Sequence, residues 1–545
     1  MFAFGRRMVD NFGWRFLFLL ASVYFCVKGL VYRISYAAFL PYLRHKLGVD
    51  DATRYQSLFT VCLLPWSLKP FLGMISDVLP IGGYHKRWYI QASVVVGVIA
   101  CVLLAVAPVG EVAGGVLAAV LFSFLTAETA ASDLLVEGMY SEKMVAVPES
   151  GSDMVTTVWS LYQAGAFFAA IVVAGVADQD PANFFWVCLP IAAQLTIPVG
   201  AGWLGETRVV GGFRRDKVSA NGRYFALGTL MGVAAIGLGV VSLWASVLTQ
   251  AVYSIVVSVI LCGLSLWWLP PMHGRAHVYM FLTTALNANI RGALDPFYTG
   301  DAKCNPSGPH FDLRFYLSWS AAVGSVAGLA GIAIFQLFLA RTWYRRAFWT
   351  TTLLQVAAGA MDILIVARVN LRVGISDKAA YLLGDSIVQD VVIMMDTMPQ
   401  IVLLSKLCPP GMESVVYSLL AGCMNFGAAV ASSVGSLAID RFGIRTPADG
   451  TACTFDNLGW LIFFCHVCLP LLTVPLTFVL VPAAKMTDDL LASADDGRGY
   501  ELATKHSGAD GGASWGGDPA EPDTWIAPDA PGGAPPLLPP TGDGA

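Results

Sequence analysis

Charged residues are scarce in this sequence. Asp, Glu, Lys and Arg make up 13% of the 545 residues, hydrophobic residues make up 56%, and the mean hydropathy is +0.64. A soluble chain is ordinarily about a quarter charged. The apolar residues occur in long blocks, and a block of about 20 is what a helix needs to cross a bilayer. Only helices and closed barrels satisfy their backbone groups there, and the blocks are too long for barrel strands. The sequence therefore predicts an all-α polytopic membrane protein.

Other absences narrow the class further. No basic stripe suggests nucleic acid as a partner, and no CxxC pair or Cys/His cluster suggests a metal, so no cofactor is expected. Most of the eleven cysteines lie inside apolar blocks, where a packing role is expected. The seven histidines show no grouping of the kind that catalysis requires, which disfavours a membrane-embedded enzyme.

Fourteen apolar segments are long enough to be membrane spans. They are residues 14–42, 54–77, 88–109, 112–137, 153–177, 183–205, 223–246, 248–270, 276–299, 315–340, 347–369, 379–405, 412–438 and 458–482. The pattern divides as six, two and six. Two parallel six-helix halves are typical of a rocking transporter with its site at the interface of the halves.

This pattern predicts six regions along the chain. They are an N-terminal tail (1–13), a six-helix bundle (14–205), a basic loop (206–222), an extra helical hairpin (223–270), a second six-helix bundle (271–482) and a tail (483–545). The last region is rich in Gly and Pro and cannot bury a core, so we expect it to be disordered. Loops on the side of the N-terminus hold seventeen Lys and Arg residues against ten on the other side. This asymmetry predicts that both termini are cytoplasmic.

Charges inside apolar blocks are the most informative residues, since each costs about 2.5–3.5 kcal/mol at the centre of a spanning helix. They are Lys28, Arg33, Lys69, Glu128, Asp133, Glu137, Arg291, Asp295, Asp362, Asp385, Asp390 and Asp396. Both signs occur in both halves, so mutual pairing is feasible. Arg291 and Asp295 lie four residues apart and could form either a packing ion pair or part of a site.

We hypothesise that Lys69, Asp133, Arg291 and Asp390 line a central cavity. The cations would hold an anionic substrate, and a carboxylate in a partly dry cavity could carry a proton. Asp133, Asp390 and Glu128 are the candidates for proton coupling.

The segment between the second and third spans contains Gly73 and Asp77, followed by a short loop that ends in His85, Lys86 and Arg87. Asp77 at a helix end could make charge contacts with Lys86 or Arg87 that hold one conformation. Gly73, Asp77, Lys86 and Arg87 are thus candidates for a conformational latch. This arrangement resembles the signature loop of the major facilitator superfamily.

Three longer segments sharpen the resemblance. They are PWSLKPFLGMISDVLPIGGYHKRWY (65–89), ETAASDLLVEGMYSEK (128–143) and GDSIVQDVVIMMDTMPQIVLLSKLCPPGMESVVYSLLAGCMNFG (384–427). In order and spacing they resemble the folate–biopterin transporter family of that superfamily, over roughly residues 20–480. The resemblance implies a carrier of folates or biopterin-type pteridines, apparently with protons. A pteridine ring offers an amide and amino edge that a carboxylate can grip with two parallel hydrogen bonds.

Several alternatives stay open at this point. The same family includes members assigned to other solutes such as S-adenosylmethionine, and a non-transporting membrane sensor could share the fold. The plasma membrane is the expected location, the bilayer and protons are the expected partners besides the solute, and the oligomeric state is left open.

Two cysteines differ from the rest. Cys304 and Cys453 fall in predicted outside loops, where a disulfide is compatible with the compartment. A bridge between them and two free thiols are both open.

Overall fold

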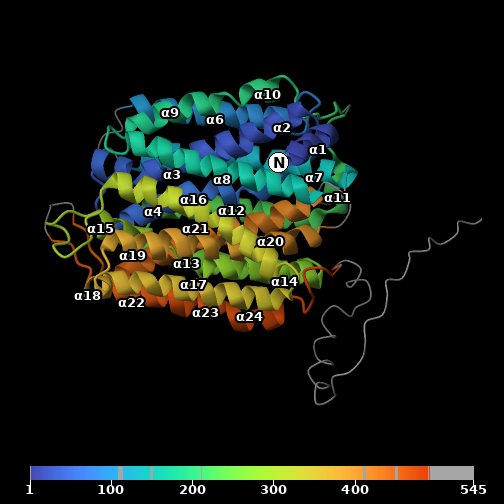
Figure 1. Cartoon of the computed structure of the whole chain (residues 1–545). Coiled ribbons are helices and arrows are strands. Elements are labelled where there is room, and N and C mark those ends of the chain that lie inside the picture. Colours follow the sequence, from blue (N-terminus) through green and yellow to red (C-terminus); the bar gives the residue numbers. More distant parts are fainter. Residues whose placement is uncertain are drawn as a thin grey trace, which may run out of the picture. The chain divides into compact units, whose positions relative to one another are not determined.

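The computed structural model describes residues 2–107, 115–147, 151–209, 211–408, 413–447, 452–488 and 490. The segment predicted to be a disordered tail lies almost wholly outside these residues, as do residues 409–412 of the third family segment. In Figure 1 the spanning helices lie side by side, with the blue and cyan helices of the first half on one side and the yellow to red helices of the second half on the other.

The first half contains all elements before the basic loop; η marks a π-helical segment. They are α1 (Phe2–Phe12), α2 (Trp14–Leu20), η1 (Ala21–Val31), α3 (Tyr32–Leu40), η2 (Pro41–Lys46), α4 (Ala52–Ser67), α5 (Lys69–Val78), α6 (Arg87–Val106), α7 (Val116–Ala146), α8 (Gly151–Val176), α9 (Ala182–Ala193) and α10 (Thr196–Gly200). The elements from α2 to η2 form one continuous span, and so do α4 and α5.

A short helix and a helical hairpin follow. They are α11 (Arg215–Ala220), α12 (Gly222–Trp244) and α13 (Val247–Trp268). The second half then contains α14 (Pro271–Ala285), α15 (Arg291–Thr299), η4 (Phe315–Trp319), α16 (Ser320–Ile334), η5 (Phe335–Leu339), α17 (Tyr344–Val366), α18 (Val369–Arg372), α19 (Asp377–Tyr381), η6 (Leu382–Gln389), α20 (Asp390–Lys406), α21 (Glu413–Arg441), α22 (Leu458–Ile462), η7 (Phe463–Cys468), α23 (Leu469–Leu471) and α24 (Thr473–Leu480).

The prediction of an all-α membrane protein of the major facilitator type is confirmed, but one of the fourteen predicted spans is not a continuous helix. Thirteen helices among the described residues are long and apolar enough to cross a membrane. The predicted span 276–299 is not one of them, because α14 ends at Ala285 and α15 begins only at Arg291. The polar sequence Asn-Ala-Asn at 287–289 interrupts the helix there.

The helical hairpin contacts both halves through buried polar side chains. From the first half, Ser57 of α4 donates to Gln250 Oε1 of α13 at 2.9 Å. Toward the second half, Ser254 of α13 lies 2.6 Å from Ser433 of α21, hydroxyl to hydroxyl. Hydrogen bonds of this kind hold spanning helices together where no hydrophobic driving force acts between them. The hairpin is therefore packed into the bundle.

Candidate functional site

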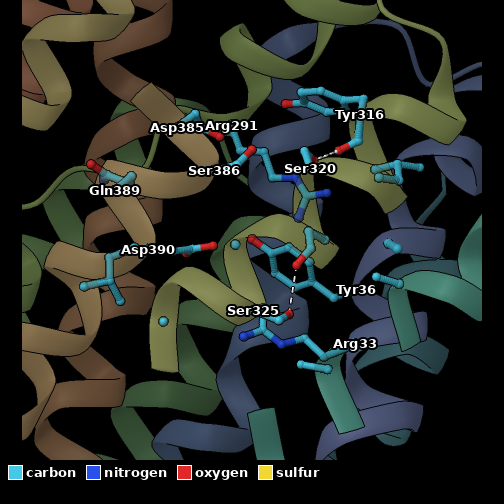
Figure 2. Close-up of a pocket in the computed structure, with 18 of the residues that line it drawn as sticks. Arg33, Tyr36, Arg291, Tyr316, Ser320, Ser325, Asp385, Ser386, Gln389 and Asp390 are labelled. Carbon is cyan, nitrogen blue, oxygen red and sulfur yellow. Dashed lines mark hydrogen bonds between the residues drawn. The ribbon is translucent and has the colours of Figure 1, made fainter. Parts of the chain in front are cut away.

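A cavity of about 450 Å³ lies between the two halves. Its size falls within the range of about 300–1,000 Å³ that is usual for small-molecule sites. Figure 2 shows Arg33 and Tyr36 of the first half on one side and Asp385, Gln389 and Asp390 of the second half facing them, with Arg291 between. The polar residues of the lining are Arg33, Tyr36, Gln163, Asn287, Asn289, Arg291, Asp295, Tyr298, Tyr316, Ser320, Ser325, Tyr381, Asp385, Ser386, Gln389, Asp390 and His466.

Arg291 is the most tightly held cation of this cavity. Its Nε donates to Asp295 Oδ2 at 2.7 Å, one turn along α15. Its guanidinium lies over the ring of Tyr36, 4.3 Å from the ring centre, and 4.9 Å from that of Phe59. Asp295 also accepts from the Tyr55 and Tyr316 hydroxyls, each at 2.7 Å. The guanidinium is thus fixed in place by one carboxylate and two ring faces, which stabilise a desolvated cation.

The break before Arg291 brings polar backbone to the cavity. Gln56 of α4, in the first half, satisfies backbone groups on both sides of the break. The Gln56 Nε2 donates to Asn289 O at 2.9 Å, and Gly292 N donates to the Gln56 Oε1 at 2.7 Å. Irregular backbone at membrane depth is tolerated where protein or a cavity satisfies it in this way. The break leaves the N-terminus of α15, the positive end of its helix dipole, at the cavity wall.

The facing wall belongs to a π-helical segment. Asp385, Ser386 and Gln389 lie on η6, and Asp390 begins α20 directly after it. The wider turn of a π-helix redirects side chains and is frequent at functional sites. Asp390 packs against Gly324 of α16, where any larger side chain would collide with its Oδ2. Opposite them, the Arg33 guanidinium lies 5.3 Å from the centre of the Tyr162 ring.

Several polar atoms of the lining are buried and yet have no hydrogen-bond partner among the described residues. They are Arg33 Nε, Gln163 Oε1, Arg291 Nη1, Ser386 Oγ and Gln389 Oε1. A buried polar group without a partner costs about 1–3 kcal/mol, so such groups are rare unless they serve a purpose. Their concentration in one cavity indicates a site for a polar ligand.

The structure separates the four residues that we predicted to share one cavity. Arg291 and Asp390 line it, whereas Lys69 and Asp133 lie in a second cluster, here called the lysine cluster, with Lys28 and Glu137. Asp133 accepts from Lys69 at 2.5 Å and from Lys28 at 2.9 Å, and its side chain is 3% exposed. Three elements of the first half, η1, α5 and α7, contribute these residues, and their mutual pairing keeps Lys69 and Asp133 out of the cavity lining.

The lysine cluster is enclosed by aromatic rings. Lys69 Nζ lies 4.8 Å from the centre of the Trp66 ring, and Lys28 Nζ lies 5.6 Å from that of Trp159. Tyr140 donates to Glu137 at 3.1 Å, and Tyr417 of α21 also hydrogen-bonds to Glu137. Tyr417 therefore links the second half to this cluster.

Glu128 lies apart from both clusters. It is fully buried in α7, and neither carboxylate oxygen has a hydrogen-bond partner among the described residues. It packs against Gly97 of α6, where an added Cβ would collide with the carboxylate. It does not line the cavity, so its predicted proton-coupling role has no direct geometric support.

The predicted latch residues lie at the bundle end that carries the N-terminus, here called the N-terminal end. Lys86 pairs with Glu142 of α7 at 2.7 Å, and Arg87 donates to the carbonyl of Gly200. Glu206 accepts from the backbone N–H groups of Lys86 and Arg87 at 3.0 and 3.1 Å, which caps the start of α6. Glu142 and Glu206 lie outside the loop motif, so the motif alone does not reveal them.

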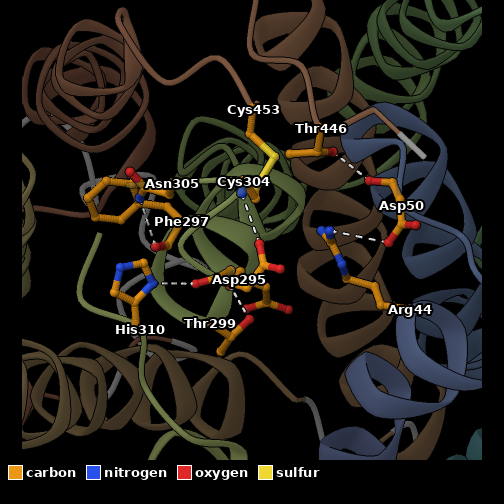
Figure 3. Close-up of a disulfide and its surroundings, with 12 residues drawn as sticks. Arg44, Asp50, Asp295, Phe297, Thr299, Cys304, Asn305, His310, Thr446 and Cys453 are labelled. Carbon is orange, nitrogen blue, oxygen red and sulfur yellow. Dashed lines mark hydrogen bonds and ion pairs between the residues drawn. A yellow bond between two sulfur atoms is a disulfide. The ribbon is translucent and has the colours of Figure 1, made fainter. Parts of the chain in front are cut away.

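The opposite end of the bundle, here called the disulfide end, carries the bridge between Cys304 and Cys453. Figure 3 shows it beside Thr446, which donates to the backbone oxygen of Asp50 in the first half at 2.5 Å. The bridge joins the loop after α15 to the loop before α22, so it ties the broken helix to the last span of the second half.

Sequence reasoning missed most of the cavity. Gln163, Gln389, Ser386 and the tyrosines Tyr36 and Tyr316 carry no charge and therefore did not stand out. One signal was present: Asn287 and Asn289, four and two residues before Arg291 in an otherwise apolar segment, mark a broken helix.

A helical bundle of two halves around a polar central cavity is the architecture of a transporter of the major facilitator type. A solved peptide transporter, POT in complex with sulfate, has this fold: its TM-score is 0.58 at 14% identity, and the match covers 90% of this chain and 98% of that one. At this identity the likeness concerns the fold alone.

The family model of the BT1 family matches residues 28–497, and the chain belongs to that family. It is 26% identical over 502 residues to a probable folate-biopterin transporter 2 of Arabidopsis thaliana, covering 90% of this chain and 88% of the relative. It is 27% identical over 473 residues to a folate-biopterin transporter of Synechocystis, covering 86% of this chain and 82% of the relative. The predicted resemblance is thereby confirmed, and the protein is a membrane transporter.

Proposed function

We propose that this protein is a secondary active transporter that moves folates or biopterin-type pteridines by alternating access, coupled to protons. The names of the relatives in Arabidopsis and Synechocystis support the solute class. The observation that carries the proposal is the cavity between the halves, which combines two guanidinium groups, several carboxylates and unpartnered polar atoms. A site at the interface of two halves is reached from either side when they rock.

The chemistry of the cavity fits a folate. Its glutamate tail needs cations, and Arg33 and Arg291 offer forked donors on one face of the cavity. The N-terminus of α15 adds a positive dipole end at the same place. On the facing wall, Asp390 and Gln389 offer the oxygens that the amide and amino edge of a pteridine ring requires.

S-adenosylmethionine is the alternative solute. Its sulfonium and amino groups could pair with the carboxylates of the cavity, and its own carboxylate could pair with Arg33 or Arg291. The charges of the cavity therefore accommodate both solutes, and a transport assay separates them.

We assign the proton-coupling role to Asp390. It lies at the cavity wall opposite Arg33, so substrate binding and release change its surroundings. Asp133, already paired with two lysines, is assigned a structural role instead. The loop with Gly73, Asp77, Lys86 and Arg87 is proposed to stabilise one conformation, with the Lys86–Glu142 pair anchoring the loop to α7 within the first half.

The excess of Lys and Arg on the N-terminal side supports cytoplasmic termini. On this basis we propose that the protein lies in the plasma membrane with the disulfide end outside. This orientation also puts the bridge in a compartment that permits it.

Uptake into proteoliposomes tests the proposal. Purified protein is reconstituted and given labelled folate, biopterin or S-adenosylmethionine, each with and without an inward proton gradient. We expect accumulation of folate or biopterin above the empty-liposome level, and more of it with the gradient. Uptake of S-adenosylmethionine instead would reassign the solute, and binding without uptake of any of them would indicate a sensor.

A further inference from the structure

A second, apolar hollow lies on a different part of the bundle, between α5 and the hairpin. Its volume is about 560 Å³. Ten of its eleven lining residues are apolar or glycine, and the other is Thr229; they are Phe71, Met74, Ile75, Val78, Phe213, Val218, Gly222, Phe225, Ala226, Thr229 and Leu230. We call it the hairpin groove. Its composition excludes a polar solute.

The groove lies along the contact between α5 and α12. The two helices pack closely there, because Gly228 and Gly232 form a G-x-x-x-G pair against Met74 and Phe71. An added Cβ on Gly232 would lie 3.1 Å from Phe71 Cβ. The segment before α12 adds Phe213 to the lining and is held by a 2.9 Å bond from Arg214 N to Val78 O.

The length of the groove matches one leaflet of a bilayer. From Gly222 to Leu230 the axis of α12 rises by about 12 Å. Half of the hydrocarbon core is about 15 Å thick. The groove therefore runs from the membrane surface toward the midplane, as an acyl chain does. Leu230 and Phe213 are 40% and 54% exposed, so the groove is open to the bilayer.

The rim of the groove is basic. The segment 206–223 holds five cations, Arg208, Arg214, Arg215, Lys217 and Arg223, against two acidic residues, Glu206 and Asp216. Glu206 is engaged at the start of α6. Arg215 and Lys217 are exposed, and Arg215 lies one turn before the groove residue Val218 on α11. The cations thus lie at the depth of lipid headgroups.

We propose that the hairpin groove binds an anionic glycerophospholipid, with one acyl chain along α12, the phosphate against Arg215, and Lys217 adding to the positive charge of the rim. An apolar slot of one leaflet's depth with cations at its mouth is complementary to this molecule. Because the groove is shared by α5 and α12, the lipid would join the hairpin to the helix that carries Gly73 and Asp77. The inference does not depend on the identity of the transported solute.

Native mass spectrometry of the delipidated, detergent-solubilised full chain tests this proposal. The protein is titrated with dioleoyl phosphatidylglycerol or dioleoyl phosphatidylcholine, which share their acyl chains. Each cation near an anionic surface contributes about 1 kcal/mol, so two of them predict on the order of tenfold tighter binding of phosphatidylglycerol. Arg215→Gln with Lys217→Gln should remove this preference, while Arg341→Gln with Arg346→Gln, which changes two exposed cations after η5, should leave it unchanged.

A second pair of variants tests the acyl-chain slot. Thr229→Trp fills the groove from an exposed position and should weaken the binding of both lipids, whereas Val259→Trp, at a 68% exposed position of α13 outside the groove, should not. Equal affinity for the two lipids in the wild-type protein, or unchanged binding in Thr229→Trp, would overturn the proposal. Displacement of phosphatidylglycerol by millimolar inorganic phosphate would mean that a free anion is recognised instead of a lipid, which also overturns it.

Discussion

The lysine cluster and the arginine cavity contain the same kinds of residue, buried in the same bundle, but they differ in how completely their charges are paired. In the lysine cluster one carboxylate, Asp133, forms ion pairs with both Lys28 and Lys69. In the cavity, Arg291 uses its Nε for Asp295 but has a buried Nη1 with no partner among the described residues. Arg33 Nε is likewise buried and has no hydrogen-bond partner among the described residues.

The elements that supply the residues explain this difference. The cations and carboxylates of the lysine cluster all come from the first half, which moves as one body in the proposed alternating-access cycle. The cavity takes its residues from both halves, with Arg33 on α3 and Asp390 on α20. A cluster within one half can keep its pairs through the cycle, whereas groups on two halves must exchange partners. Complete pairing thus indicates structure, and incomplete pairing at the interface indicates function.

The largest effect should come from breaking the lysine cluster. Asp133→Leu leaves the buried Lys69 and the partly exposed Lys28 without their shared carboxylate. Removing one partner of a buried ion pair costs about 3–5 kcal/mol. We therefore expect a much lower unfolding temperature for the detergent-solubilised protein, with poor surface expression.

A charge-free variant provides the control for this effect. Lys28→Met with Lys69→Met, Asp133→Leu and Glu137→Gln replaces the four ionic groups of the cluster by uncharged ones of similar size, which is often neutral. It should recover much of the lost stability. If Asp133→Leu alone unfolds at the wild-type temperature, the cluster is not a structural unit, and the contrast with the cavity fails.

The next largest effect should be on binding. Arg291→Gln removes a guanidinium at the cavity wall but leaves Asp295 hydrogen-bonded to Tyr55 and Tyr316, so the fold should persist. A hydrogen bond to a charged group is worth about 1.5–3 kcal/mol, which predicts a 10- to 100-fold weaker affinity for folate.

Equilibrium binding of labelled folate measures this change. Arg291→Lys keeps the charge without the forked donors and should be intermediate. Arg314→Gln, at a half-exposed position paired with Asp178, is the matched control and should bind normally. A normal affinity in Arg291→Gln would remove the cavity's best-supported substrate contact.

The sequence predicted the class of fold well, because long apolar blocks and their order depend on the bilayer alone. The prediction failed at the ninth span, 276–299, where the helix is broken. The break depends on two asparagines and on their contact with Gln56, which lies 231 residues before Asn287. The prediction also grouped Lys69 and Asp133 with Arg291 and Asp390. Depth and charge are readable along one chain, but the pairing of helices that are far apart in sequence is not, and pairing decides which charges meet.

A smaller and more specific effect is expected at Asp390. Asp390→Asn keeps the size of the side chain but removes its ability to carry a proton. We expect folate to bind more weakly, because one acceptor oxygen toward the pteridine edge is replaced by an NH2 donor. Folate should still exchange across proteoliposomes at equal pH, while accumulation driven by a proton gradient is lost. Asp396→Asn is the matched control on the same helix, since Asp396 accepts from Thr351 and Gln400 and does not line the cavity. Gradient-driven accumulation at the wild-type level in Asp390→Asn would move proton coupling to another carboxylate.

The smallest effect should come from breaking an exposed ion pair. The stability lost there can be compared with the loss on breaking the buried pairs. Asp312 lies before η4 at the disulfide end and pairs with Lys378 at 2.8 Å, with both side chains more than half exposed. Partial burial raises the pKa of Asp312, but hydrogen bonds from Lys378 and from Phe315 N outweigh it, and the pKa is lowered overall. Stability from a carboxyl whose pKa is lowered in the folded protein is present above its unfolded pKa and is lost as the pH falls through the folded one.

Asp312→Asn retains the helix-capping oxygen, since Asn caps as well as Asp does, and removes only the charge. An exposed pair is worth about 0.2–1 kcal/mol, so the unfolding temperature at neutral pH should fall slightly. At a pH below the folded pKa of Asp312 the variant and the wild-type protein should unfold together, and high salt should shrink the difference at neutral pH. If Asp312→Asn lowered the unfolding temperature at neutral pH as much as Asp133→Leu does, exposed ion pairs would be as strong as buried ones. The contrast between exposed and buried pairs would then be wrong.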